Sequence, residues 1–141
     1  MQSDFKSVYE TTVNAPVEKV WEALTNPLIV KQYFFGSNLE TDWVVGNPIY
    51  FKGEYNGMAY QDKGIVLEFE PLHKLSFSYL SNWSGLPDKP ENYLFVQYEV
   101  FDLKNLTKLV ITQSNYDETR AKHSASNWEN VIDGLKKILN S

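Results

Sequence analysis

Residues 5–13 alternate between hydrophobic and polar side chains, with Tyr9 and Val13 on the same face. This period of two is typical of a β-strand that is covered on one face. After Pro16 the pattern changes, because apolar residues recur three and four positions apart, which predicts a helix with one buried stripe. Proline suits the first helical turn, where its missing N–H costs no hydrogen bond. The predicted stripe consists of Val17, Val20, Trp21 and Leu24.

The next segments predict a second short helix followed by a series of strands. The helix covers Leu28 to Tyr33 and ends near Gly36, a residue type favoured after helices. The strands alternate with a period of two and are separated by short turns, which predicts an antiparallel meander. They cover residues 39–45 as a weak edge strand, 49–51 leading to an Asn56-Gly57 turn, 60–69, 75–79, 94–101 and 108–113.

The C-terminal segment predicts a long helix that begins between Asp117 and Ser126. Ser126 and Glu129 fit a capping box, but residues 118–124 also have a helical pattern, so the start stays open. The apolar residues of this segment keep the spacing that forms one helix face. They are Trp128, Val131, Ile132, Leu135, Ile138 and Leu139.

This order of elements predicts an α+β fold in one domain spanning residues 1–141. A curved antiparallel sheet of about six to seven strands is expected to grip the C-terminal helix, with two short helices after the first strand. Such a sheet cannot contact one helix along its whole length, so part of the gap is expected to stay open as a cavity. Aromatic residues, at 15% of the chain, supply rings to line that cavity or to fill the core.

Charge and composition exclude several classes of function. The formal net charge of −5 would repel a phosphate backbone, so no nucleic-acid binding is expected. Without cysteine, and with only His73 and His123 as histidines, neither a metal nor another cofactor is expected. No signal peptide or long apolar run is present, which favours a cytoplasmic protein without membrane contact. A monomer or weak dimer is expected.

Five motifs follow one another along nearly the whole chain. They are residues 13–24, Lys31-Gln32-Tyr33-Phe34, residues 45–51, the pair 64–71 and 74–77, and Asn127-Trp128-x3-Ile132-x2-Leu135. In this order they resemble AHSA-type proteins, the homologues of the activator of heat-shock protein 90 ATPase in the SRPBCC or START-like helix-grip superfamily. Tyr33 replaces a Trp of the family motif, and Asn47 replaces a Gly.

The resemblance implies a sheet that grips a C-terminal helix around an apolar cavity, but no single activity, because fold does not define function. We favour the hypothesis that the cavity binds a small hydrophobic or aromatic molecule, lipid-like or polyketide-like. In a second hypothesis the protein is a chaperone-ATPase activator or a stress adaptor with a protein partner. In a third it is a cyclase or hydrolase acting on an aromatic substrate, although no catalytic residue is assigned.

The residues expected to bind the ligand lie at alternate strand positions, after the second short helix and on one face of the long helix. They are Tyr33, Phe34, Phe51, Phe77, Tyr79, Tyr98, Ile111, Gln113, Trp128 and Ile132. Core packing is the alternative role for these residues, and it is the favoured role for Trp21. Buried tyrosine and glutamine groups would need polar partners, from a ligand, from water or from one another.

Three further features have two interpretations each. Tyr33 to Phe35, before Gly36, could rim the cavity mouth or fix the short helix to the sheet. The loop 81–90 carries Trp83 and could be a lid, a contact surface or a segment folded back on the domain. Glu68 would have a raised pKa if it were buried, but an outward, solvated Glu68 is the favoured interpretation.

Overall fold

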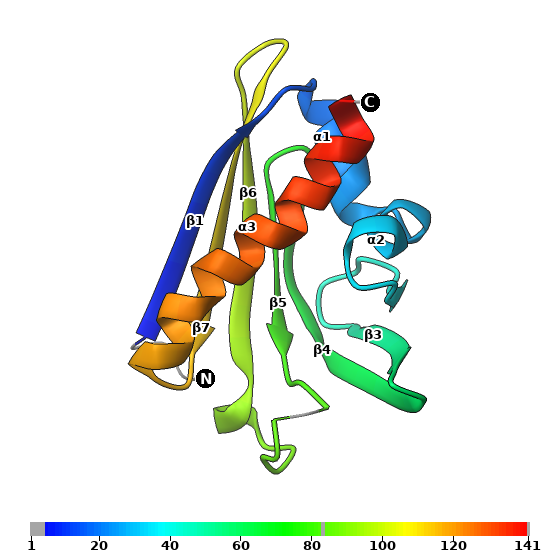
Figure 1. The fold of residues 1–141 in the computed structure, drawn as a ribbon, viewed down its shortest axis with the longest axis vertical. Helices are drawn as coiled ribbons and strands as arrows, with labels where there is room; N and C mark the ends of the chain where they lie inside the picture. The colour runs from blue at the N-terminus through cyan, green and yellow to red at the C-terminus, as the bar shows by residue number, and fades with distance from the viewer. Residues whose placement is uncertain (1–4, 83, 141) are drawn as a thin grey trace.

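The computed structural model describes residues 5–82 and 84–140 (Figure 1). The elements follow in the order β1 (Phe5–Val13), α1 (Val17–Thr25), α2 (Pro27–Tyr33), β2 (Asn38–Glu40), β3 (Pro48–Tyr55), β4 (Met58–Glu70), β5 (Lys74–Tyr79), a 3-10 helix (Pro90–Asn92), β6 (Leu94–Asp102), β7 (Thr107–Asn115) and α3 (Glu118–Asn140). Trp83, on which the lid interpretation depends, lies outside the described residues. None of the described helices is both long and apolar enough to cross a membrane.

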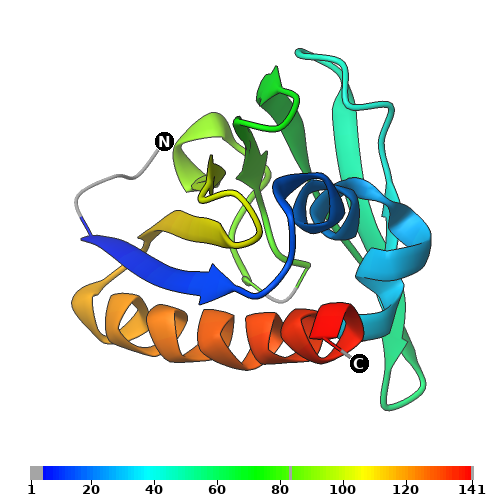
Figure 2. The ribbon, with the colours of Figure 1, turned by 90° about the horizontal axis from the view of Figure 1, so that it is seen from above.

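The strands form one seven-stranded antiparallel sheet in the order β1-β7-β6-β5-β4-β3-β2. Helix α3 runs across one side of this sheet, and the strands curve around it (Figures 1 and 2). Helices α1 and α2 pack against each other and against α3 near its C-terminal end. The predicted α+β helix-grip fold, with two short helices after the first strand, is therefore confirmed.

The β3–β4 hairpin forms where the Asn-Gly signal predicted it. Asn56 and Gly57 have φ angles of 52° and 79°, and the flanking residues Tyr55 and Met58 are paired. Positive φ at both central positions is typical of a two-residue turn that matches the twist of the strands. Local sequence therefore sets the register of this hairpin.

The predicted edge strand 39–45 is wrong in its second half, because β2 is only three residues long. The side-chain oxygens of Thr41 and Asp42 accept hydrogen bonds from the backbone N–H two residues further on, at 3.0 and 2.9 Å. Such local bonds compete with a strand ladder and turn the chain away from the sheet. Trp43 then points inward, and its indole N–H donates to the carbonyl oxygen of Thr25 at 3.1 Å.

Helix α3 begins at the earlier of the two predicted starts. The carboxylate of Asp117 accepts the backbone N–H of Arg120 at 2.7 Å, as an N-terminal cap does. Ser126 and Glu129 consequently lie inside the helix, and the capping box that they resemble is not used. The face that turns toward the sheet includes Trp128, Val131, Ile132 and Leu135, all of them buried.

Fully buried aliphatic side chains gather where α1 and the C-terminal part of α3 meet the sheet. We call this region the closed half. Its most completely buried side chains include Val13, Val20, Leu75, Leu109 and Leu135. Trp21 lies at its border, 8% exposed, with its ring 5.6 Å from that of Phe69. The prediction that Trp21 is a core residue is confirmed.

Candidate ligand-binding cavity

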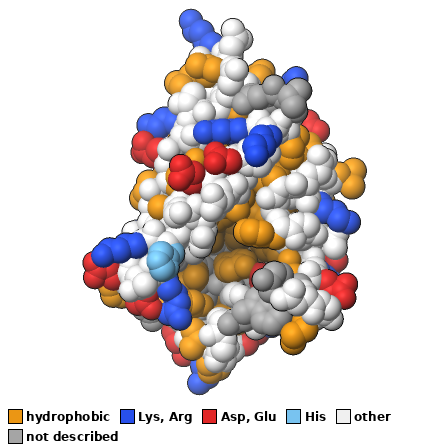
Figure 3. All heavy atoms as spheres, viewed as in Figure 1, with side chains coloured by type: hydrophobic (Ala, Val, Ile, Leu, Met, Phe, Trp, Pro, Cys, Tyr) orange, Lys and Arg blue, Asp and Glu red, His pale blue; other side chains and the backbone are white. Residues whose placement is uncertain are grey.

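A cavity of about 680 Å³ lies between the sheet, the N-terminal half of α3 and the turn that follows α2. In the space-filling view, hydrophobic side chains gather in a hollow beside α3 (Figure 3). Ligand pockets in proteins commonly have volumes between roughly 300 and 1,000 Å³ and apolar walls. The dimensions of this cavity therefore suit a small organic molecule.

Five rings form a continuous aromatic wall of the cavity: Phe34, Phe51, Phe77, Tyr79 and Trp128. Phe51 lies at the centre, stacked on Phe34 at 5.5 Å and close to Phe77 and Tyr79 at 5.7 and 6.0 Å between ring centroids. Phe34 also contacts Trp128 of α3 at 6.0 Å, which links the sheet to the helix. The wall thus joins four parts of the chain: the turn after α2, β3, β5 and α3.

The cavity begins between two adjacent rows of the concave face of the sheet. In one row Val96 of β6 pairs with Phe77 on one side and Gln113 on the other, and all three line the cavity. In the next row Tyr98 pairs with Leu75 and with Ile111, and these three belong to the buried core. A step of two residues along each strand therefore separates open space from packed core.

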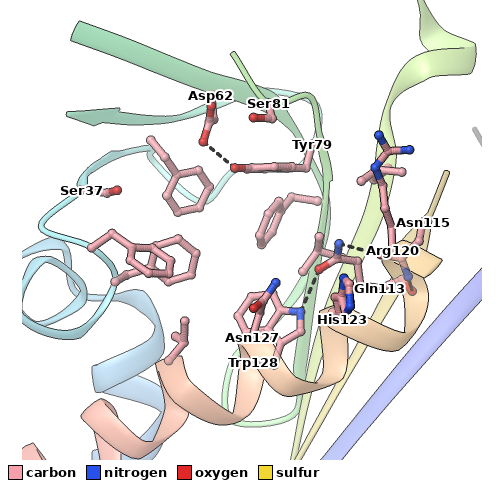
Figure 4. A pocket seen from close by; sticks show the side chains of 18 of the residues that line it. Ser37, Asp62, Tyr79, Ser81, Gln113, Asn115, Arg120, His123, Asn127 and Trp128 are labelled. Atoms are coloured by element: carbon pink, nitrogen blue, oxygen red, sulfur yellow. Dashed lines mark hydrogen bonds between the residues drawn. The ribbon is translucent and has the colours of Figure 1, made fainter. Parts of the chain in front are cut away.

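One end of the cavity carries a buried carboxylate, Asp62 of β4, which is 7% exposed. Its Oδ2 accepts a hydrogen bond from the hydroxyl of Tyr79 (Figure 4). Its Oδ1 accepts one from the backbone N–H of Asn82 at 2.7 Å. Close to it, the hydroxyls of Ser37 and Tyr60 bond to each other at 2.6 Å. This group of residues forms the carboxylate end of the cavity.

Burial is the main cause that raises the pKa of Tyr79 far above its usual value, and the charge and hydrogen bond of Asp62 act in the same direction. A phenol with a raised pKa keeps its proton at neutral pH and donates it in hydrogen bonds. Tyr79 is therefore the donor and Asp62 the acceptor in this pair.

The opposite end of the cavity is formed by amide and basic side chains of β7 and α3 (Figure 4). The indole N–H of Trp128 donates to Oε1 of Gln113 at 2.8 Å, and the amide of Gln113 donates to Oδ1 of Asn115 at 3.2 Å. Arg120 and His123 extend this end toward solvent. Arg120 forms an ion pair with Asp117, with 2.6 Å between its Nη1 and Oδ2 of the aspartate.

The structure brings six of the ten predicted ligand-binding residues to the cavity: Phe34, Phe51, Phe77, Tyr79, Gln113 and Trp128. The other four, Tyr33, Tyr98, Ile111 and Ile132, pack in or against the core instead. Tyr33 fixes α2 in place, because its hydroxyl donates to the carbonyl oxygen of Ala23 at 2.7 Å. The rim interpretation thus suits Phe34 and Phe35, which line the cavity, and the packing interpretation suits Tyr33.

Sequence reasoning missed most of the polar lining. Asp62 lies in phase with Tyr60, Gly64 and Val66 on β4, and a carboxylate at an inward strand position was the signal that could have found it. On α3, Ser124 and Val131 are spaced four before and three after Trp128, so helical periodicity places them beside it. The remaining lining residues are Phe35, Ser37, Glu54, Tyr60, Ser81, Leu94, Val96, Asn115, Tyr116, Arg120, His123 and Asn127.

Glu68 does not belong to the cavity, and the favoured outward interpretation is confirmed. Its carboxylate accepts a hydrogen bond from Ser76 at 3.0 Å and pairs with Lys74 at 3.2 Å. These hydrogen bonds lower the pKa of Glu68, with Lys74 as the largest cause. The cavity lining includes ionisable side chains such as Asp62 and His123, which an enzyme of the third hypothesis would use. Within the described part of the chain, no cluster of potential metal ligands is found.

The fold and the site define an α+β helix-grip protein with a cavity between its sheet and its C-terminal helix. A model of the family described as Activator of Hsp90 ATPase homolog 1-like protein matches residues 14–140. Because the match covers most of the chain, the protein belongs to this family, as the motif resemblance predicted. Among curated proteins, none matches the chain.

Solved structures share the fold. The solution structure of ChR145 from Cytophaga hutchinsonii has a TM-score of 0.85 and 43% identity, and the alignment covers 99% of this chain and 97% of that one. PFC0360w, an HSP90 activator from Plasmodium falciparum, has a TM-score of 0.73 and 20% identity over 96% of each chain. DynU16, from the dynemicin biosynthetic locus, has a TM-score of 0.79 and 22% identity, covering 98% of this chain and 48% of DynU16.

Proposed function

We propose that this protein binds a small hydrophobic or aromatic molecule in the cavity between the sheet and α3. The observation that carries the proposal is the aromatic wall, which borders about 680 Å³ of space between two polar ends. Phe35, which also lines the cavity, is 76% exposed, and an apolar ligand would remove part of that surface from water. The cytoplasmic location predicted from the sequence is part of this proposal.

The polar groups support a binding role because the protein already satisfies them. Gln113 and Tyr79 have protein partners, so the predicted need for polar partners is met within the protein. Among the described residues, every fully buried side-chain nitrogen or oxygen has a partner. A preorganised site of this kind can accept a ligand without first rearranging its walls.

The test is a thermal-shift and native mass-spectrometry screen with lipids and aromatic metabolites. A ligand at a hundredfold excess over its Kd is expected to stabilise the folded protein by about 2.7 kcal/mol. Val96→Phe serves as the blocking variant, because Val96 lines the cavity and a phenyl ring would occupy it. Stabilisation should disappear in this variant. The proposal is wrong if no compound stabilises the wild-type protein, or if Val96→Phe is stabilised equally.

A second candidate function is chaperone activation through a protein partner. It is favoured by the family match and by the fold shared with the Plasmodium falciparum HSP90 activator. Leu28 and Phe35, 77% and 76% exposed, offer apolar surface for such a contact on and just after α2. The measurement is the ATPase rate of the cognate chaperone with and without this protein. An unchanged rate and no co-purified chaperone would contradict this function.

A further inference from the structure

The carboxylate of Asp62 is buried without a cationic partner among the described residues. It takes part in none of the ion pairs found there. The adjacent Lys63 is no substitute, because it pairs with Asp88. Taking a charge out of water is costly unless an opposite charge or several hydrogen bonds compensate it. Asp62 is therefore a site where a cation would be stabilised.

The hydrogen bonds of Asp62 leave part of its accepting capacity unused. Tyr79 donates to one carboxylate oxygen and the backbone N–H of Asn82 to the other. An ionised carboxylate has about four lone-pair positions, so about two remain available. Because the side chain lines the cavity, a bound molecule can reach these positions. The vacant acceptor positions favour a hydrogen-bond donor. Because two hydrogen bonds compensate the charge only in part and no ion pair of Asp62 is found among the described residues, a positively charged donor is favoured.

The surroundings of Asp62 also favour a cation. Phe51 and Tyr79 place their rings in the same cavity wall, 6.0 Å apart, and the faces of aromatic rings attract positive charge. Glu54, which lines the same cavity from β3, adds a second carboxylate. The two basic residues of the lining, Arg120 and His123, lie on α3 at the opposite end (Figure 4). Arg120 is already neutralised by Asp117.

Resting on the proposed ligand-binding function, we propose that the cavity selects aromatic molecules that carry an ammonium group. The ammonium lies against Asp62, and the ring of the ligand lies against Phe51 and Phe77. This deepens the proposed function by naming the ligand class. Neutral donors such as alcohols fit the two vacant acceptor positions but leave the charge uncompensated. Carboxylates would meet repulsion from Asp62 at this end of the cavity.

The experiment compares three probes of one shape: naphthylmethylamine, naphthylmethanol and naphthoate. Their affinities are measured by isothermal titration calorimetry at neutral pH. The amine is expected to bind about tenfold tighter than the alcohol, with the carboxylate weakest. Equal affinity of amine and alcohol would overturn this inference and leave the proposed function intact. No binding of any probe would overturn both.

Three variants assign the preference to its cause. Asp62→Asn keeps the shape of the side chain but removes its charge, so the amine should lose its advantage while the alcohol still binds. Asp133→Asn makes the same change at an exposed position of α3 outside the cavity, and it should keep the advantage. Tyr79→Phe removes one neutral hydrogen-bond donor to Asp62, and this variant should also bind the amine more tightly than the alcohol. A preference that survives in Asp62→Asn, whose folding is checked by its melting transition, would overturn the inference.

Discussion

The closed half and the cavity half share one sheet and one helix but differ in what fills the space between them. In the closed half, α1 inserts Val20 and Leu24 beside aliphatic side chains of the sheet, and the space is filled. In the cavity half no described residue of α1 lines the space, and the rings of the aromatic wall, including Phe34 of the turn after α2, border the open volume. The cavity thus follows from incomplete coverage of the curved sheet.

The largest expected difference between the two halves is the cost of removing a leucine. Leu75 in the closed half is 0% exposed, and Leu94 at the cavity is 7% exposed. We expect Leu75→Ala to lower the free energy of unfolding by about 3–4 kcal/mol, and Leu94→Ala by about half as much. Only the first change creates a new void, because Leu94 already borders open space. Urea denaturation followed by tryptophan fluorescence measures both values, and equal losses would contradict the comparison.

The reverse change, adding volume, should separate the halves as well. Val96 and Val100 lie on the same face of β6 and are both 3% exposed, but only Val96 lines the cavity. We expect Val100→Phe to cost about 1–3 kcal/mol, since overpacking forces the core to shift, and Val96→Phe to cost less than about 1 kcal/mol. The measurement is the same denaturation experiment. If both variants lose the same stability, the cavity is not open in solution.

The smallest effect concerns how far water reaches the cavity wall. Burial raises the pKa of Tyr79 in the cavity and of Tyr33 beside the core, so both phenols keep their protons in the folded protein. This contribution to stability is complete below the unfolded pKa of about 10 and is lost as pH rises above it. Between about pH 9 and pH 11, wild type should lose roughly 1.4 kcal/mol more than Tyr79→Phe.

Denaturation curves across this pH range give the loss, and phenolate absorbance reports ionisation directly. Tyr33→Phe is the matched variant on the core side and should behave in the same way. If Tyr33→Phe reduces the loss of stability at alkaline pH and Tyr79→Phe does not, then Tyr79 ionises in the folded protein. The cavity wall would then be wetter than the core, and the comparison between the halves would become sharper.

Much of the fold could be predicted from local patterns. The alternation of β6 and the stripe Val17, Val20, Trp21 and Leu24 each reflect burial of one face, which a period reveals directly. The Asn56-Gly57 turn needs only two residues with positive φ. The error in β2 arose because Thr41 and Asp42 bond to their own backbone, a competition that hydrophobicity does not show.

The site was less predictable, because periodicity shows which face of the sheet a residue lies on but not whether the cavity or another side chain covers it there. Phe77 and Leu75 have the same phase on β5 and are both buried, yet only Phe77 lines the cavity. Gln113 and Ile111 differ in the same way on β7. Where the open region begins depends on how far α1 reaches over the sheet, and no single strand carries that information.

The order of elements, the inward face of nearly every strand and, through five motifs in one order, the family could all be predicted from the amino-acid sequence. These properties depend on neighbours in the chain, so a local pattern records them. The position of the cavity, and the hydrogen bond between Asp62 and Tyr79 within it, could be seen only in the folded protein. The physical reason is that the cavity is the volume left over after distant elements have packed. The charge and the size of the cavity therefore depend on how these elements are arranged and not on any one segment.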